Sequence, residues 1–307
     1  MKIDIEKRDR ICFLGDSITA HGIWEAEVIE YFLQNHKELE IEFYNCGISG
    51  SQGRYAELKG RLYCDFLNYF PRYAVILFGA NDIGRHLYDP AKETPEAIKE
   101  REDRITGYEA TLHRLVEVCR ERGITPMICT PTPYDEFNDP PERPWRIDEG
   151  LSKFADAAKR VAEENGLLLI DMREICVEHI KERPICEDRL HPNAYGYHLM
   201  AEKFLFDIGV KDRIEPDKPC VLSEKNKNRF EIEDILRDII FVDRDYMGWQ
   251  YDEKSFSLRQ RKILLKKRIE RDPRDFSRVL ENYVKYADVK DELQGELLKR
   301  TVEMYKD

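Results

Sequence analysis

Five short apolar runs alternate along this chain with longer stretches in which apolar side chains recur every three or four positions. The runs are ICFLG (11–15), IEFYNCG (41–47), YAVILFGA (73–80), TPMICTPT (125–132) and LLLIDM (167–172). Because they are apolar at successive residues, they are typical of strands covered on both faces. The stretches between them have the spacing of amphipathic helices. This order predicts a doubly wound α/β fold around a parallel sheet of about five strands.

The expected helices cover 23–35, 54–70, about 95–122 and 145–165, and a last one begins within DRLHPNAYGYHLMAEKFLFDIG (188–209). Pro192 has no amide hydrogen and suits the first turn of that helix, whereas the residue before a proline is disfavoured in helical geometry. We therefore expect His191 at the entrance of the helix.

The composition changes after residue 212, where a polar connection leads into charged, helix-like segments without strand-like runs. Residues 1–210 carry 27 Lys and Arg against 39 Asp and Glu, a net charge of −12, whereas residues 211–307 carry a net charge of +1. The sequence predicts a main domain at 1–212 and a charged helical C-terminal extension at 213–307.

The charge of the main domain argues against nucleic acid as a partner, because an acidic surface repels a phosphate backbone. The basic segment 259–271 has the opposite charge and favours docking onto this domain or onto that of a second subunit. The C-terminal helices are therefore a candidate homodimer contact, and the alternative is that the basic segment is a solvated helix face.

Neither a membrane segment nor a metal site is expected. The N-terminus MKIDIEKRDR is charged, and no apolar run approaches the length that spans a bilayer. We expect a cytoplasmic protein without membrane insertion. The eight cysteines form no CxxC pair and the seven histidines no HExxH motif, so we expect no metal and no other cofactor.

Glycine-bearing polar turns follow the first three predicted strands. They are Gly15-Asp16-Ser17, Gly47-Ile48-Ser49-Gly50 and Gly79-Ala80-Asn81-Asp82. Because ligands of open parallel sheets bind at the carboxyl ends of the strands, these turns should meet at one site. Ser17 is then a candidate nucleophile, and the alternative role for it is an ordinary helix cap.

A serine nucleophile needs a base, and a carboxylate that orients the base. Asp188 precedes His191 by three residues, which lets its carboxylate reach the Nδ1 side of the imidazole while Nε2 points outward. His21 and His86 are alternative bases, because both lie in loops at the same sheet edge, although neither has a carboxylate placed in this way.

Hydrogen-bond donors for a developing oxyanion are available in the same turns. Gly50 has no side chain to obstruct its backbone N–H, Asn81 has a side-chain NH₂, and Ser17 supplies its own N–H. Asp16 and Asp82 stand next to two of these donors, and we expect them to brace the turns.

These residues resemble the four ordered sequence blocks of the SGNH hydrolases, also called GDSL esterases and lipases. The blocks correspond to GDSI with Ser17, GISG with Gly50, GAND with Asn81, and Asp188-x-x-His191-Pro192. The resemblance covers residues 11 to about 208, and Ile18 replaces the leucine of the family name. It implies a flavodoxin-like three-layer α/β/α sandwich, a Ser17–His191–Asp188 triad, and Gly50 and Asn81 in the oxyanion hole. The C-terminal helical extension has no counterpart in the minimal family domain.

The expected activity is that of a serine ester hydrolase. The resemblance implies an acyl-enzyme on Ser17, and we expect an acetyl or other short acyl group to be removed from a small O-acylated substrate such as a carbohydrate. A thioesterase or a lysophospholipase with the same triad is the alternative among enzymes. An alternative of another class is a catalytically silent binding protein whose helical extension recruits a partner.

Overall fold

The computed structural model describes residues 3–56, 62, 66–137, 146–224, 226, 292–293, 295–296 and 299. The chain divides into one compact unit of residues 1–58 and 69–222 and a second unit of residues 59–68 and 223–307. Most of the second unit lies outside the described residues, and with it the basic segment 259–271. The domain boundary after residue 212 and the homodimer contact therefore stay predictions.

One sheet of parallel strands forms the centre of the first unit, with the strand order β2-β1-β3-β4-β5. The strands are β1 (Arg10–Gly15), β2 (Glu42–Asn45), β3 (Tyr73–Leu77), β4 (Thr125–Cys129) and β5 (Leu168–Ile170). In the register, Phe13 of β1 is level with Asn45 of β2 and Val75 of β3. This is the flavodoxin-like order of a doubly wound sheet, so the predicted sheet of about five parallel strands is confirmed.

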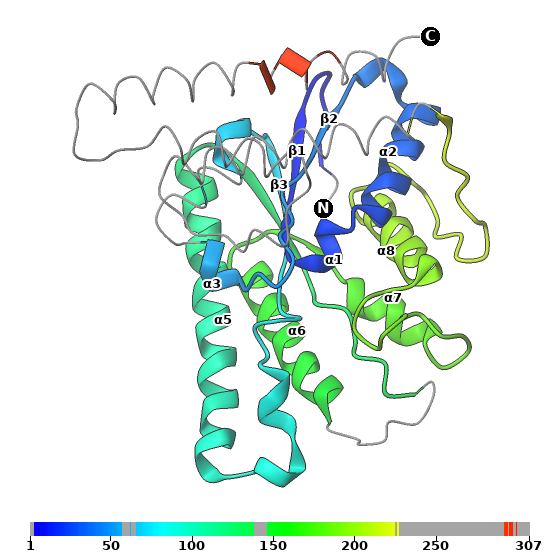
Figure 1. The fold of residues 1–307 in the computed structure, drawn as a ribbon. Coiled ribbons are helices and arrows are strands. Elements are labelled where there is room, and N and C mark those ends of the chain that lie inside the picture. The colour runs from blue at the N-terminus through cyan, green and yellow to red at the C-terminus, as the bar shows by residue number, and fades with distance from the viewer. Residues whose placement is uncertain are drawn as a thin grey trace. The chain divides into compact units, whose positions relative to one another are not determined.

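Helices cover both faces of this sheet and form the two outer layers of an α/β/α sandwich. The α-helices are α1 (Ser17–Ala20), α2 (Ile23–Asn35), α3 (Gly53–Ala56), α5 (Pro95–Glu121), α6 (Ile147–Glu164), α7 (Met172–His179) and α8 (Ala194–Asp207). The 3₁₀ helices are η1 (Lys37–Leu39), η2 (Leu67–Tyr69), η3 (Arg85–Tyr88) and η4 (Pro90–Lys92). Figure 1 shows α5 and α6 on one side of the strands and α2, α7 and α8 on the other.

One predicted helix starts later in the structure, and another is described only in part. The last helix begins at Ala194 and not at Pro192, because the side chain of Asn193 caps it by accepting the N–H groups of Tyr195 and Gly196. Within the predicted helix 54–70, residues 54–56 belong to α3, Leu62 is helical and residues 67–69 form η2, whereas residues 57–61 and 63–65 lie outside the described part of the chain. The short helix α7 has no counterpart among the predicted elements.

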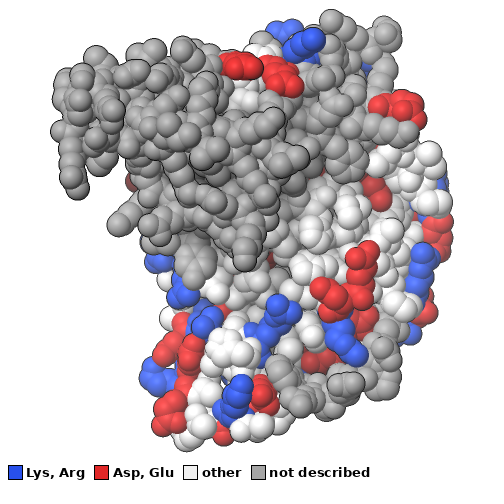
Figure 2. Space-filling view, viewed as in Figure 1, with Lys and Arg blue, Asp and Glu red and all other residues white. Residues whose placement is uncertain are grey.

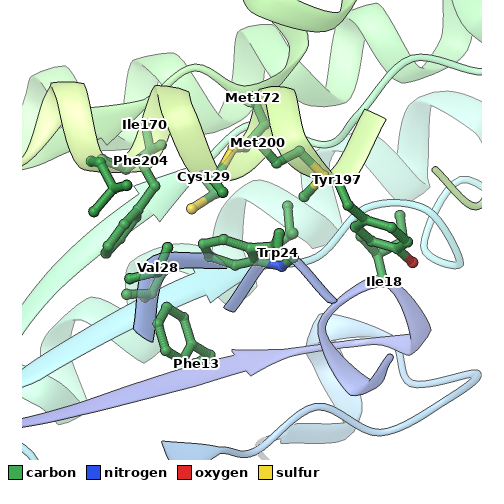
Figure 3. Packing of buried hydrophobic residues seen from close by; sticks show 14 of the residues in the cluster. Phe13, Ile18, Trp24, Val28, Cys129, Ile170, Met172, Tyr197, Met200 and Phe204 are labelled. Atoms are coloured by element: carbon green, nitrogen blue, oxygen red, sulfur yellow. The ribbon is translucent and has the colours of Figure 1, made fainter. Parts of the chain in front are cut away.

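A cluster of buried aromatic rings packs β1 against α2 and α8 (Figure 3). The Trp24 ring is fully buried, with its centroid 5.0 Å from that of Phe13 and 5.5 Å from that of Phe204. Aromatic side chains contribute large buried areas, so this contact is a main source of stability for the unit. It also holds the end of β1, after which Ser17 lies, against α8, the helix that follows Asp188 and His191.

The described surface carries charges of both signs. On the face shown in Figure 2, Lys and Arg side chains are interspersed with Asp and Glu side chains over the described residues. Among the described helices, none combines the length and apolar character needed to cross a bilayer. The cytoplasmic location stays a prediction from the sequence.

Candidate active site

Ser17 is the first residue of α1 and is separated from the end of β1 by Asp16 alone. The side chain of Asp16 caps this helix, with its Oδ1 accepting the N–H of Ile18 at 3.0 Å. The turn requires glycine before it, because a Cβ at Gly15 would lie 2.2 Å from Thr19 Oγ1. The strand, the cap and the glycine together place Ser17 at the carboxyl edge of the sheet.

His191 and Asp188 meet Ser17 from the loop before α8. The Nε2 atom of His191 lies 2.8 Å from Ser17 Oγ, and its Nδ1 atom lies 2.7 Å from Asp188 Oδ2. The other carboxylate oxygen of Asp188 accepts the backbone N–H groups of Leu190 at 3.1 Å and of His191 at 2.8 Å. The structure thus brings the three residues that the sequence predicted into one hydrogen-bonded series.

Two opposing effects act on the pKa of Asp188. Partial burial alone would raise this pKa, but hydrogen bonds from the backbone and the ring of His191 hold it below its usual value. An ionised Asp188 favours the tautomer in which Nδ1 of His191 carries the hydrogen. Nε2 is then an acceptor for the hydroxyl of Ser17, which is the arrangement that general-base activation requires.

The loop that carries these two residues is tied down on both sides. The backbone N–H of Asn193 donates to Ile185 O at 2.8 Å, and the N–H of Asp135, from the loop after β4, donates to Arg189 O at 2.8 Å. Arg189 has a φ of 73°, in the left-handed region that a residue with a side chain rarely adopts. The sequence reasoning missed Asp135 because its backbone N–H, which almost any residue could supply, makes this contact.

Gly50 and Asn81 lie in two turns that the structure joins to each other and to β1. Asn81 Nδ2 donates one hydrogen to Ser51 O at 3.1 Å, which leaves its second hydrogen for another acceptor. The N–H of Ile48 donates to Gly15 O at 3.0 Å, next to the turn of Ser17. Gly50 is exposed, has a φ of 75°, and would meet nothing within 4 Å if a Cβ were added.

Two buried carboxyl groups lie beneath these turns. Burial raises the pKa of Asp16 to about 7, and nearby Asp82 adds to this effect, whereas the hydrogen bond from Ile18 opposes it. Burial also raises the pKa of Asp82 to about 6, against the hydrogen bonds that it accepts from Gly53 and Gly79. Both side chains brace their turns through these bonds, as the sequence led us to expect.

The alternative bases occupy different positions. The ring of His21 lies beside that of His191, with centroids 5.1 Å apart, and its Nδ1 is 2.7 Å from Tyr197 Oη. His86 is exposed on η3. The hydroxyl of Ser17 is paired with His191, which favours His191 as the base. Sequence reasoning missed Tyr197, because a buried aromatic residue in a helix carries no sign of such a contact.

The side chains that meet here offer a hydroxyl, an imidazole, a carboxylate and N–H donors. Among the described residues, no three His, Cys, Asp or Glu side chains are grouped as a metal site requires. A nucleophile, an oriented base and donors for an anion are the components of acyl transfer through a serine.

Comparison with known proteins agrees with this chemistry. A sequence model of the GDSL-like Lipase/Acylhydrolase family matches residues 13–199, a range that contains all five predicted site residues. An acetylxylan esterase of Geobacillus stearothermophilus is 29% identical over 223 residues, which make up 66% of this chain and 95% of that enzyme.

Solved structures show the same fold. The crystal structure of an acetylxylan esterase from Geobacillus stearothermophilus has a TM-score of 0.57 and 27% identity, covering 68% of this chain and 98% of that one. A putative GDSL-like lipase from Parabacteroides merdae has a TM-score of 0.57 and 23% identity, covering 69% of this chain and 100% of that one. The second likeness concerns the fold alone.

Proposed function

The chain belongs to the GDSL-like lipase/acylhydrolase family and is a carboxylic ester hydrolase, and we propose that Ser17, His191 and Asp188 are the triad with which it removes acetyl groups from a small O-acetylated carbohydrate. The observation that carries the proposal is the series of hydrogen bonds, 2.8 Å from Ser17 Oγ to His191 Nε2 and 2.7 Å from His191 Nδ1 to Asp188 Oδ2. If Ser17 were only a helix cap, it would not need hydrogen bonds that continue through His191 to Asp188.

Acylation begins when Ser17 Oγ attacks the ester carbonyl carbon and His191 Nε2 takes the hydroxyl proton. The carbonyl oxygen becomes an oxyanion, while Asp188 stabilises the imidazolium that forms. When the oxyanion collapses, the bond to the alcohol oxygen breaks, and His191 gives its proton to the departing alcohol. Ser17 then carries the acyl group.

Deacylation repeats these steps with water. His191 takes a proton from a water molecule as the water oxygen attacks the acyl carbon, and it then protonates Ser17 Oγ as the carboxylic acid leaves. The enzyme returns to its starting state, so that one water molecule is consumed for each ester bond broken.

The oxyanion is stabilised by donors from the three turns. Ser17 is the first residue of α1, so its N–H has no acceptor within the helix. The N–H of Gly50 and the second hydrogen of Asn81 Nδ2 complete the set. Removal of one such donor commonly lowers kcat by about 10²- to 10³-fold.

The substrate class rests on the similarity to the acetylxylan esterase, which extends over 95% of that enzyme. A thioester or a lysophospholipid would use the same triad, and these substrates are the alternatives to be tested. The triad alone does not select among them, because acyl length and the alcohol part are read by other surfaces of a site.

The test is a comparison of kcat/KM for esters of one alcohol with acyl chains from acetyl to long, together with acetylated xylo-oligosaccharides, an acyl thioester and a lysophospholipid. Ser17→Ala serves as the control. We expect acetyl esters to be the best substrates, acetylated oligosaccharides among them, and activity to depend on Ser17. Preference for a thioester or a lysophospholipid would contradict the proposed substrate, and full activity of Ser17→Ala would contradict the proposed triad.

A further inference from the structure

We propose that Asp82 is a positioning residue for the oxyanion hole, whose carboxylate holds the turn that carries Gly50 against the turn that carries Asn81. This inference rests on the proposed function, because it takes Gly50 and Asn81 as the oxyanion donors. Asp82 itself would not touch the substrate and would act through these two residues.

The contacts of Asp82 span the two turns. Its Oδ1 accepts the backbone N–H of Gly53 at 2.9 Å, and its Oδ2 accepts the backbone N–H of Gly79 at 3.1 Å. Gly53 begins α3 and follows the turn of Gly50, whereas Gly79 begins the turn of Asn81. Asp82 is only 7% exposed, so these bonds replace water as the partners of its carboxylate.

Asn81 ties the same two turns together from the other side. Gln52 Nε2 donates to Asn81 O at 3.0 Å, and Asn81 Nδ2 donates to Ser51 O at 3.1 Å. Three hydrogen bonds therefore join residues 51–53 of one turn to Asn81 and Asp82 of the other. Gly50 directly precedes this bonded stretch, so a shift of the stretch would move the Gly50 N–H and rotate the Asn81 amide together.

The chemistry of the side chain explains why an aspartate stands here. The two N–H groups donate to different oxygens of the carboxylate, and an asparagine amide would present an acceptor oxygen to one of them but an NH₂ donor to the other. Burial of this carboxylate is costly, as the rise of its pKa to about 6 indicates. A group that only capped a turn would not need to incur this cost, because one neutral acceptor would suffice.

The experiment measures kcat and KM of Asp82→Asn, with Asp89→Asn as the matched control. Asp89 is also a buried aspartate in the segment after β3, and it accepts one N–H, from Ala91 at 3.0 Å, within its own turn. We expect Asp82→Asn to lower kcat about 10- to 100-fold with KM within about threefold, since displacement by about 1 Å can cost 10²-fold in rate. Asp89→Asn should leave kcat within about twofold of the wild type.

A double variant separates positioning from a purely structural role. If Asp82 acts through Asn81 and Gly50, its replacement in an Asn81→Ala background should cost distinctly less than in the wild type, because residues that act as a unit are not additive. If Asp82→Asn only damaged the structure, its fold loss in kcat would multiply with the fold loss caused by Asn81→Ala. Gln52→Ala provides a second variant in case Asp82→Asn does not fold, and we expect it to lower kcat by about 3- to 10-fold at nearly constant KM.

The outcomes distinguish this inference from the function on which it rests. If Asn81→Ala loses activity while folded Asp82→Asn and Gln52→Ala match the wild type, the oxyanion assignment stands and the positioning role is wrong. Fully multiplicative losses in the double variant would also overturn that role. If Asn81→Ala itself is fully active, both the oxyanion assignment and the role of Asp82 fail.

Discussion

Gly196, in the first turn of α8, tests how closely the loop of Asp188 and His191 must pack on this helix. In an exposed helix, replacing glycine with alanine stabilises the protein by about 1 kcal/mol. At Gly196, however, the new Cβ would lie 2.2 Å from Ile185 O and 2.9 Å from Pro192 Cβ. Such overpacking commonly costs about 1–3 kcal/mol, so we expect Gly196→Ala to lower the free energy of unfolding by up to about 2 kcal/mol.

The same substitution should also reduce activity. To relieve this contact, residues 185–192 must move away from α8 by about 1 Å, the difference between the 2.2 Å that the new Cβ would have from Ile185 O and an ordinary van der Waals distance. His191 lies within this segment, and a displacement of about 1 Å can cost 10²-fold in rate. We therefore expect kcat of Gly196→Ala for an acetyl ester to fall by about 10²-fold.

The control is Gly107→Ala in α5, where an added Cβ would meet nothing within 4 Å. This variant should gain up to about 1 kcal/mol and keep its kcat. Urea unfolding and steady-state kinetics of both variants provide the test. If Gly196→Ala were as active as the wild type and more stable, the close packing of the loop on α8 would not be what positions His191.

Three further predictions concern the site and its carboxyl groups. Asp188→Asn should lower kcat, because the uncharged side chain stabilises the required His191 tautomer less well. Steady-state kinetics should show a loss no larger than that of Ser17→Ala. Asn81→Ala should lower kcat by about 10²- to 10³-fold with KM within a few-fold, and an effect on KM alone would instead assign Asn81 to ground-state binding. Because burial raises the pKa of Asp16 to about 7 and of Asp82 to about 6, the folded protein keeps protons that the unfolded chain releases near pH 4. The free energy of unfolding should then fall as pH rises from about 4 to 7, by up to about 1.4 kcal/mol per pH unit for each group, and Asp16→Asn should flatten this slope in urea titrations.

Features that depend on local sequence could be predicted. Asp188 and His191 are three residues apart, so their contact needs only a turn, and the turn of Ser17 follows from the apolar run before it. The convergence of three turns at one edge follows from the parallel order of the strands. These features were sufficient to name the residues of the proposed triad.

Features that depend on backbone donors or on distant packing could not be predicted. The partners of Asp82 are the N–H groups of Gly53 and Gly79, and a sequence carries no sign of which N–H groups come together. The N-cap of α8 could have been predicted, since asparagine is favoured at this position. The proline before it instead suggested an earlier start of the helix.

The central claim is that Ser17 Oγ is a nucleophile activated by His191. Its most direct test is to treat the protein with a fluorophosphonate and to locate the covalent adduct by mass spectrometry, with Ser17→Ala and His191→Ala as controls. We predict one adduct, on Ser17, absent in Ser17→Ala and formed far more slowly in His191→Ala. An adduct on another residue, or labelling of Ser17→Ala at the rate of the wild type, would contradict the claim.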